Sequence, residues 1–459
     1  MSDVILNTWD GPTIPVHAVT EVGVAEALAS DAFTAGLAKT ADFKGKAGQA
    51  LLVPAADGEL GRVLFGLGDG GDPMVFRALP AKLPAAGVYQ LTATPAGHTP
   101  ERIALAFALG SYRFDRYKAA ATERPRLVLP TADLTEAIAI SHACALCRDM
   151  INTPANDMGP LQLETIAREV AEQYAAVMSV VTGDDLLAAN YPAIHAVGRA
   201  AHPDRASRMI EISWGAPGNP LIALVGKGVV FDTGGLDIKP SAGMRQMKKD
   251  MGGAAHALAL GRMIMAANLP VRLVILLPVV ENAISGDAMR PGDILASRKG
   301  LSIEVGNTDA EGRLILADAL TRAAELEPAL TIDLATLTGA ARAALGPQLP
   351  PYYTDDDGLA AQIDAAALAE ADPLWRMPLW KPYAEALDSD IADLKNDPDG
   401  WAQAGSVTAA LFLQRFAPTG PWVHLDIFAW NPKARAGWPA GGEAQTIRGL
   451  YRMIRERFA

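Results

Sequence analysis

The segment from Gly306 to Leu314 places three ionisable side chains, Asp309, Glu311 and Arg313, at alternate positions. On extended backbone, residues two apart point to the same side. Two carboxylates and a guanidinium would then face one site, just before an amphipathic helix that we expect to begin at Leu314. Taken by itself, the spacing favours a simpler interpretation, in which a polar loop caps this helix.

A second segment changes that balance. Lys227 ends an apolar run, where a charge is costly to bury without a partner. Asp232 precedes one Gly-Gly pair and Asp250 precedes another. Carboxylates at the carboxyl ends of buried strands are where an α/β sheet places its site. Hard oxygen ligands without Cys or His suit Mn, Mg or Zn, and divalent cations would relieve the repulsion among these acids.

Other motifs are weaker. The glycines of residues 66–71 match a dinucleotide pattern, but Pro73 follows at once, and a glycine-rich turn is the better interpretation. Cys144 and Cys147 are spaced like a redox or zinc pair, yet they lie in a helical pattern and are interpreted as buried thiols. The sequence contains no Gly-x-Ser-x-Gly motif, so a serine hydrolase has no support.

The elements that must position these residues predict an α/β protein of two domains. We expect a small N-terminal α/β domain at residues 1–128, and a connecting helix with a larger catalytic domain at residues 129–459. The connecting helix is expected at 132–150. In the first domain, strand-like apolar runs lie at 49–53, 62–65 and 103–108.

The second domain alternates apolar runs with helical patterns. The runs resemble strands buried on both faces, at 221–225, 273–277 and 330–334. The helical patterns lie at 162–176, 254–267, 314–326 and 407–416. Alternation of this kind predicts a mostly parallel, mixed sheet covered by helices.

Composition narrows the class of protein. The chain has 459 residues, half of them hydrophobic, which exceeds what one core usually holds. The net charge of -12 argues against nucleic-acid binding, and the apolar runs are too short for membrane spans. Two cysteines and no basic, apolar leader at the N-terminus lead us to expect a cytoplasmic protein.

At these motifs the chain closely resembles the leucyl aminopeptidase (cytosol aminopeptidase) family of two-metal aminopeptidases. Residues 307–314, Asn-Thr-Asp-Ala-Glu-Gly-Arg-Leu, match that family's signature in full, and the spacing of the Lys and Asp residues in 227–250 matches its metal segment. The resemblance covers roughly residues 145 to 430. It implies a homohexamer that removes the N-terminal residue of peptides with a free N-terminus, with leucine among the residues released.

The resemblance also implies residue roles. One metal ion, Zn or Mn, would be held by Lys227, Asp232, Asp250 and Glu311, and a second by Asp232, Asp309 and Glu311. A ligating Lys227 must be neutral, so its pKa should be strongly lowered. Lys239 would stabilise the oxyanion, and Arg313 would hold a bicarbonate acting as general base toward the metal-bridging water. The substrate side chain would contact Met247, Thr336 and Gly339, whereas Asp237 is expected not to bind metal.

Two other functions remain open at this point. The chain could be a catalytically inactive homologue kept as a structural or regulatory oligomer, which its complete set of site residues disfavours. It could also be a two-metal phosphoesterase, since carboxylate cages serve phosphoryl transfer too. A lysine ligand and the lack of a phosphate-cradling loop count against that function.

Overall fold

The computed structural model describes residues 3–118, 123–398, 401 and 403–458. The chain forms two compact units. The first is Met1–Ala145 with Pro432–Ala440, and the second is Leu146–Asn431 with Gly441–Ala459. The boundary between the units falls inside helix α4 (Thr135–Asn152), and the domain division expected at residue 128 stays a prediction.

The first unit contains a sheet of six strands among the described residues, in the order β1-β6-β5-β2-β4-β3. All neighbours are parallel except β3 and β4. The strands are β1 (Ile5–Leu6), β2 (Ile14–Val19), β3 (Ala50–Pro54), β4 (Leu60–Gly66), β5 (Val88–Leu91) and β6 (Arg126–Val128). The helices are α1 (Val24–Leu28), α2 (Ala32–Thr40), the 3-10 helix η1 (Val75–Lys82) and α3 (Pro100–Gly110). The glycine-rich stretch after β4 forms a turn, as expected.

One sequence expectation in this unit is wrong. Residues 103–108 form the middle of helix α3, not a strand. The Thr99 side chain accepts a hydrogen bond from the backbone N–H of Arg102, and Pro100 occupies the first turn, which together favour a helix start. All six residues are buried, and a short run of buried apolar residues has no period that separates strand from helix.

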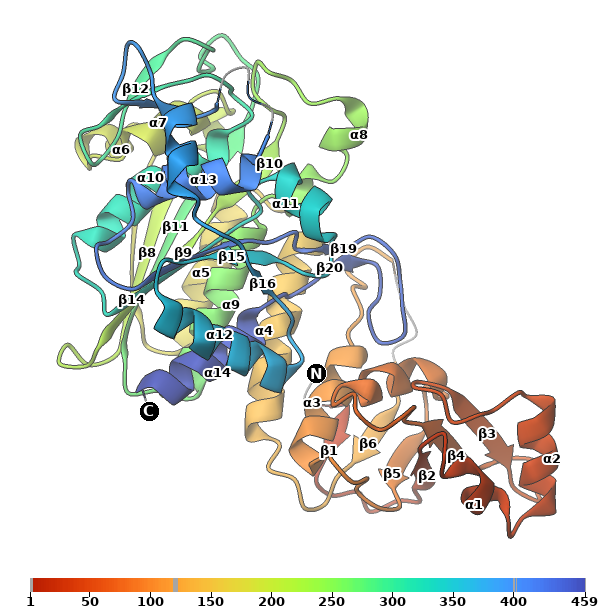
Figure 1. Cartoon of the computed structure of the whole chain (residues 1–459). Coiled ribbons are helices and arrows are strands. Elements are labelled where there is room, and N and C mark those ends of the chain that lie inside the picture. The colour runs from red at the N-terminus through yellow and green to blue at the C-terminus, as the bar shows by residue number, and fades with distance from the viewer. Residues whose placement is uncertain (1–2, 119–122, 399–400, 402, 459) are drawn as a thin grey trace. The chain divides into compact units, whose positions relative to one another are not determined.

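The second unit is built on a mixed sheet whose described strands number nine, in the order β16-β15-β18-β14-β9-β11-β8-β7, with β10 paired to β11 (Figure 1). Its centre is parallel, from β18 through β14 and β9 to β11, and β10 is parallel to β11 as well. The strands β8, β7 and β15 introduce antiparallel pairs. The mostly parallel mixed sheet predicted from the sequence is therefore confirmed.

The three apolar runs expected as strands correspond to β9, β11 and β14, although β11 continues five residues beyond its run. The sheet contains β7 (Val177–Thr182), β8 (Arg208–Trp214), β9 (Leu221–Gly226), β10 (Gly228–Asp232), β11 (Arg272–Asn282), β14 (Leu330–Ala335), β15 (Pro351–Tyr353), β16 (Trp375–Arg376) and β18 (Trp422–Asp426). Smaller sheets contain β12 (Ile294–Ala296), β13 (Ser302–Glu304) and β17 (Leu394–Lys395), and β19 (Trp430–Asn431) with β20 (Gly441–Gly442).

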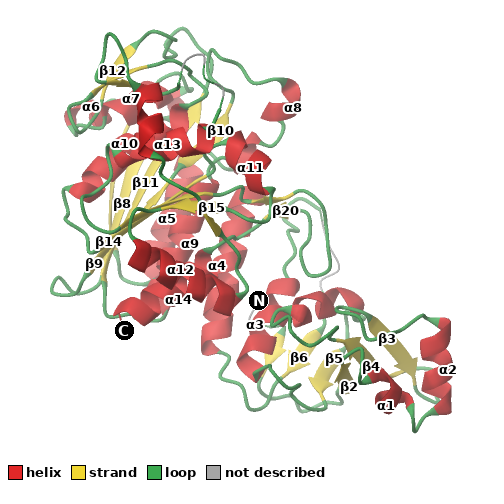
Figure 2. Cartoon of the chain, in the orientation of Figure 1, coloured by secondary structure: helices red, strands yellow, loops and turns green. Residues whose placement is uncertain are grey.

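Helices cover both faces of the central strands (Figure 2). Alternate residues of β9, Ala223 and Val225, belong to a core cluster shared with helices α7, α10 and α13. Gly226 instead faces helix α9, where a Cβ atom would lie 2.6 Å from the backbone of Ala254. Since neighbouring strand residues point to opposite faces, α9 packs on the face opposite to α10.

The helices of this unit are α5 (Pro160–Gln173), α6 (Asp185–Ala188), α7 (Pro192–Gly198), α8 (Ser241–Met244), α9 (Gly252–Ala266), α10 (Glu311–Ala324), α11 (Gly339–Leu345), α12 (Asp357–Glu370), α13 (Gly405–Gln414) and α14 (Ile447–Phe458). Four of them, α5, α9, α10 and α13, match the patterns at 162–176, 254–267, 314–326 and 407–416 to within a few residues, and the other helices had not been expected. Short 3-10 helices are η2 (Pro203–Arg205), η3 (Met247–Lys249) and η4 (Lys381–Leu387). Within the described ranges, no helix combines the length and hydropathy that crossing a membrane requires.

Helix α10 begins three residues earlier than expected. Glu311 and Arg313 lie in its first turn, so the premise of extended backbone from residue 309 to 313 is wrong. A carboxylate in the first turn is favourable because the free N–H groups there carry partial positive charge. The side chains are brought together by the loop and helix start in combination, not by strand alternation.

Candidate metal centre

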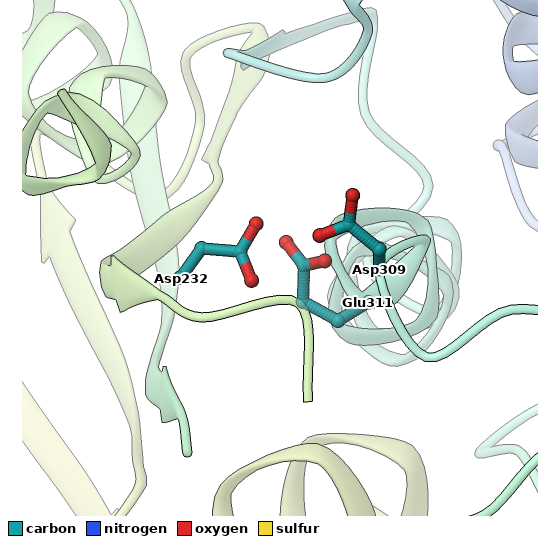
Figure 3. Close-up of side chains that lie close together, drawn as sticks. All are labelled: Asp232, Asp309 and Glu311. Atoms are coloured by element: carbon teal, nitrogen blue, oxygen red, sulfur yellow. The ribbon is translucent and has the colours of Figure 1, made fainter. Parts of the chain in front are cut away.

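Three carboxylates from two distant segments of the sequence converge at the carboxyl edge of the sheet. Asp232 is the last residue of β10, Asp309 lies in the loop before α10, and Glu311 begins that helix. Each offers an oxygen, and these oxygens all lie within 4.8 Å of one another. Figure 3 shows the three groups pointing toward a shared space. Such a group can hold a metal ion.

Two lysines pair with different carboxylates at this site. The Lys227 amine lies 2.8 Å from Asp250 and 2.9 Å from Glu311, and it donates a hydrogen bond to the Thr336 carbonyl. Gly312 makes this possible, since a Cβ atom there would overlap the Lys227 side chain.

Lys239 spans the other carboxylates. Its amine lies 2.8 Å from an oxygen of Asp232 and 2.5 Å from one of Asp309. The turn that returns the chain from Asp232 to Lys239 contains Gly234 at φ 89° and Gly235 at φ 63°. Side-chain-bearing residues rarely adopt these angles, which explains the glycine pair after Asp232.

The donor set fits divalent cations. Four carboxylates face two amines, so a surplus of negative charge remains when all are ionised. Glu311 is 1% exposed, and apart from the ion pair between its Oε1 and Lys227 no described residue donates a hydrogen bond to its carboxylate. A buried carboxylate without hydrogen bonds is costly. Bound cations would remove this cost, and oxygen with amine ligands suits Mn or Zn.

Burial and mutual repulsion change the proton affinity of the cluster. Burial, together with the charge of Asp232, raises the pKa of Glu311 to about 8. The same two causes raise the pKa of Asp309 to about 6. Protons are therefore held by groups that would have to release them to bind a metal ion.

Without bound metal ions, the pKa of Lys227 is raised, whereas from the sequence we expect it to be lowered. Burial opposes its charge, but the carboxylates of Asp250, Glu311 and Asp232 outweigh burial and raise its pKa. A neutral, metal-binding Lys227 therefore needs bound cations, which would cancel the field of those carboxylates.

Neutral amides that the sequence did not single out hold the cluster in place. The Asn282 amide, at the end of β11, donates to Asp232 at 2.8 Å and to the Thr308 carbonyl at 3.2 Å. Asn282 is a polar residue at the end of a buried strand, which is the same signal that selected Asp232. Asp237 accepts hydrogen bonds from the N–H and hydroxyl of Thr308. It thus fixes the loop before α10.

Asn396 fixes the same loop from a distant part of the chain. Its side-chain oxygen accepts hydrogen bonds from the backbone N–H groups of Gly306 and Asn307. Its side-chain NH2 group donates to the backbone carbonyls of Asn307 and Ala310. It is fully buried. No local pattern marks Asn396, because its partners lie more than 80 residues away in the sequence.

Arg313 is buried with its guanidinium on the cavity wall. One terminal guanidinium nitrogen of Arg313 donates a hydrogen bond to the backbone carbonyl of Asn396. The Nε of Arg313 has no hydrogen-bond partner within the described part of the chain. Burial lowers its pKa. The free donor is what an anion bound at this position would use.

A cavity of about 670 Å³ opens onto the cluster. Its wall includes Met247, Thr336 and Gly339, the three residues expected to contact the substrate side chain. Thr336 also donates a hydrogen bond to the Asp250 carboxylate at 2.8 Å. The structure thus brings together every site residue selected from the sequence; their roles remain predictions.

Comparison with protein families gives two matches. The catalytic-domain model of the cytosol aminopeptidase family matches residues 145–451. The model of the M17 aminopeptidase N-terminal domain matches residues 14–130.

Individual relatives agree with these matches. A probable cytosol aminopeptidase of Geobacter sp. (strain M21) is 37% identical over 454 residues, covering 92% of this chain and 91% of the relative. One from Syntrophotalea carbinolica is 42% identical over 366 residues, covering 76% and 73%. The crystal structure of a cytosol aminopeptidase from Coxiella burnetii has a TM-score of 0.95 at 44% identity, with 100% of both chains covered. The bottromycin maturation enzyme BotP, solved in complex with Mn, has a TM-score of 0.89 at 32% identity, covering 98% and 100%.

Metal affinity should rise with pH. Because Glu311 and Asp309 have raised pKa values of about 8 and about 6, protons compete with cations across this range and the competition fades as pH increases. Titration calorimetry with Mn²⁺ should show tighter binding and fewer protons released at about pH 8 than at about pH 6. Affinity that is constant or falls across this range contradicts the assignment.

Replacing Asn396 should weaken metal binding without removing a ligand. In Asn396→Ala, four backbone groups lose their partners, so the loop carrying Asp309 is no longer fixed. Outer-shell substitutions of this kind cost about 10- to 100-fold in metal affinity. Asn219→Ala, in the turn between β8 and β9, is the matched control and should bind Mn²⁺ like the parent. Equal affinity in both variants would contradict the positioning role.

Proposed function

We propose, from the premise that this chain belongs to the cytosol aminopeptidase family, that it hydrolyses the first peptide bond of peptides and aminoacyl amides at a centre of two divalent metal ions. The observation that carries the proposal is the cluster of Asp232, Asp309 and Glu311, whose oxygens lie within 4.8 Å of one another and of which Asp232 and Glu311 are buried. Its surplus of negative charge supports occupation by two cations.

The proposed ligands are Lys227, Asp232, Asp250 and Glu311 for one ion, and Asp232, Asp309 and Glu311 for the other. The proposed ions are Zn or Mn, and the solved complex of BotP with Mn supports the choice of Mn. When bound, such a pair polarises the scissile carbonyl, lowers the pKa of water and fixes the free α-amine of the substrate. Requirement for that amine restricts cleavage to the N-terminal residue.

Lys239 then acts on the developing negative charge. Its amine pairs with Asp232 and Asp309 in the chain by itself. Cations on those carboxylates would release it to donate a hydrogen bond to the oxyanion of the tetrahedral intermediate. Before cations bind, burial opposes its charge, yet the surrounding carboxylates raise its pKa and keep it a cation at neutral pH.

Arg313 is proposed to hold bicarbonate as the general base. Its unpartnered Nε and its position on the cavity wall support an anion beside the metal centre. A guanidinium matches the planar carboxylate geometry of bicarbonate. A bicarbonate held by Arg313 would supply the base that accepts a proton from the attacking water.

Location and assembly extend the proposal. A cytoplasmic location is supported by the names of the relatives, and a homohexamer by the family resemblance. Light scattering of the purified protein measures the assembly.

The alternative of an inactive homologue gains no support, since the relatives of this chain are named aminopeptidases. Turnover of aryl phosphates without turnover of aminoacyl amides would favour the phosphoesterase instead.

The activity test combines metal analysis with variants. The purified protein with Mn or Zn should release leucine from Leu-amide. Asp309→Asn and Glu311→Gln should lose both metal and activity, whereas Lys239→Ala should keep metal and lose about 100- to 1,000-fold in kcat. Asp388→Asn, at an exposed position, is the control and should match the parent. Loss of metal in Lys239→Ala contradicts its proposed role, and no turnover with any divalent ion contradicts the function.

A further inference from the structure

Lys249 is a buried amine that the proposed mechanism does not use. It ends η3, directly before Asp250, and is 5% exposed. It lines the same cavity as the carboxylate cluster. Its amine makes no hydrogen bond or ion pair with any residue that the structure describes. The contact it does make is with the Phe428 ring, whose centroid lies 4.8 Å from the amine.

The nearest carboxylates are already engaged. One oxygen of Asp426 accepts from the N–H groups of Leu337 and Thr338, and the other accepts from the hydroxyls of Thr338 and Ser406. Asp250 is held by Lys227 and Thr336. A buried amine without a polar partner is costly. Lys249 is therefore available to a ligand that enters the cavity.

A second cation lies on the same stretch of wall. The guanidinium of Arg342, in α11, is 5.0 Å from the centroid of the same Phe428 ring, and Arg342 also lines the cavity. Two cationic donors thus contact the same aromatic ring. A carboxylate is the chemical group that both can bind, through charge-assisted hydrogen bonds. The lysine amine donates hydrogen bonds whether or not it carries its third proton.

We propose that Lys249 and Arg342 bind the side-chain carboxylate of an N-terminal aspartate or glutamate, and so extend the substrate range to acidic N-terminal residues. This inference rests on the proposed aminopeptidase function. It names Lys249 as a specificity-determining residue, not a member of the metal centre.

Position favours the N-terminal side chain over the carboxyl end of a short peptide. Lys249 is the chain neighbour of Asp250, about 3.8 Å away at Cα. The substrate atoms held at the metal centre are the α-amine and the first carbonyl, and the side chain between them branches from the same Cα. The carboxyl end of even a dipeptide lies one residue further from the centre.

Three substrates without a free carboxyl terminus test the proposal. Glu-, Gln- and Leu-p-nitroanilide differ in the side chain, and Gln has the shape of Glu without its charge. The Mn-loaded parent should give a higher kcat/KM for Glu than for Gln. In Lys249→Met the Glu-to-Gln ratio should fall about tenfold or more, as expected for losing a hydrogen bond to a charged group, with Leu changed by less than about threefold.

Matched variants separate this role from general damage. Lys381→Met removes an exposed lysine of η4 outside the cavity wall and should keep the parent ratios. Arg342→Gln, at an exposed position, should also lower the Glu-to-Gln ratio. Lys249→Arg should restore part of it. If the Lys249→Met variant does not fold, the Glu-to-Gln ratio of kcat/KM in the Arg342→Gln variant tests the proposal instead.

Several outcomes would overturn the proposal. One is a parent that does not prefer Glu over Gln. Another is a ratio that Lys249→Met and Arg342→Gln leave unchanged. A third is a Lys249→Met defect confined to Leu-Gly compared with Leu-Gly-amide, which would assign the amine to the substrate's carboxyl terminus. Absence of turnover with all substrates, Leu included, would instead contradict the aminopeptidase function itself.

Discussion

Negative charge concentrated at the carboxyl edge of the second unit's sheet is the constraint on which this structure depends. Four acids meet there, and burial makes their mutual repulsion stronger than it would be in water. In the chain by itself, Lys227 and Lys239 offset part of that repulsion through short ion pairs. The arrangement remains short of positive charge, and this shortage is the physical basis for a centre of divalent ions.

The surrounding structure supports the acids largely through neutral groups. Asn282 and Asn396 hold the cluster and its loop through neutral amides. Asp426 and Asp237 also lie nearby, and each accepts hydrogen bonds from backbone N–H and hydroxyl groups. Such hydrogen bonds stabilise the ionised form of a carboxylate. An additional acid without hydrogen bonds would instead destabilise the cluster through repulsion.

One stretch of chain contributes to both chemistry and recognition. Asp250 is paired with Lys227 inside the cluster, whereas Lys249 lines the cavity beside Phe428. Under the two proposals, these adjacent residues would act on different parts of a substrate. This separation allows the cavity wall to change its preference for side chains while the carboxylates stay in place.

The sequence by itself determined the architecture and the identity of the acids. Long apolar runs predicted the buried parallel strands, and Asp232 and Asp250 were selected because they follow such runs or precede glycine pairs. The run at 103–108 failed, because burial on all sides leaves no period to separate strand from helix. The extended backbone expected before α10 failed because the helix begins at Glu311.

Only the tertiary structure decided which groups support the site and which are free. The side chain of Asn396 forms hydrogen bonds with residues 306–310, which lie more than 80 residues away in the sequence. No local sequence pattern encodes such a contact. Lys249 and Lys248 are the same residue type side by side, yet Lys248 donates to a backbone carbonyl and Lys249 lines the cavity with its amine unpaired in the described chain. Their difference arises from the packing around each side chain, because residue type fixes what a group can bind and the fold fixes what lies within its reach.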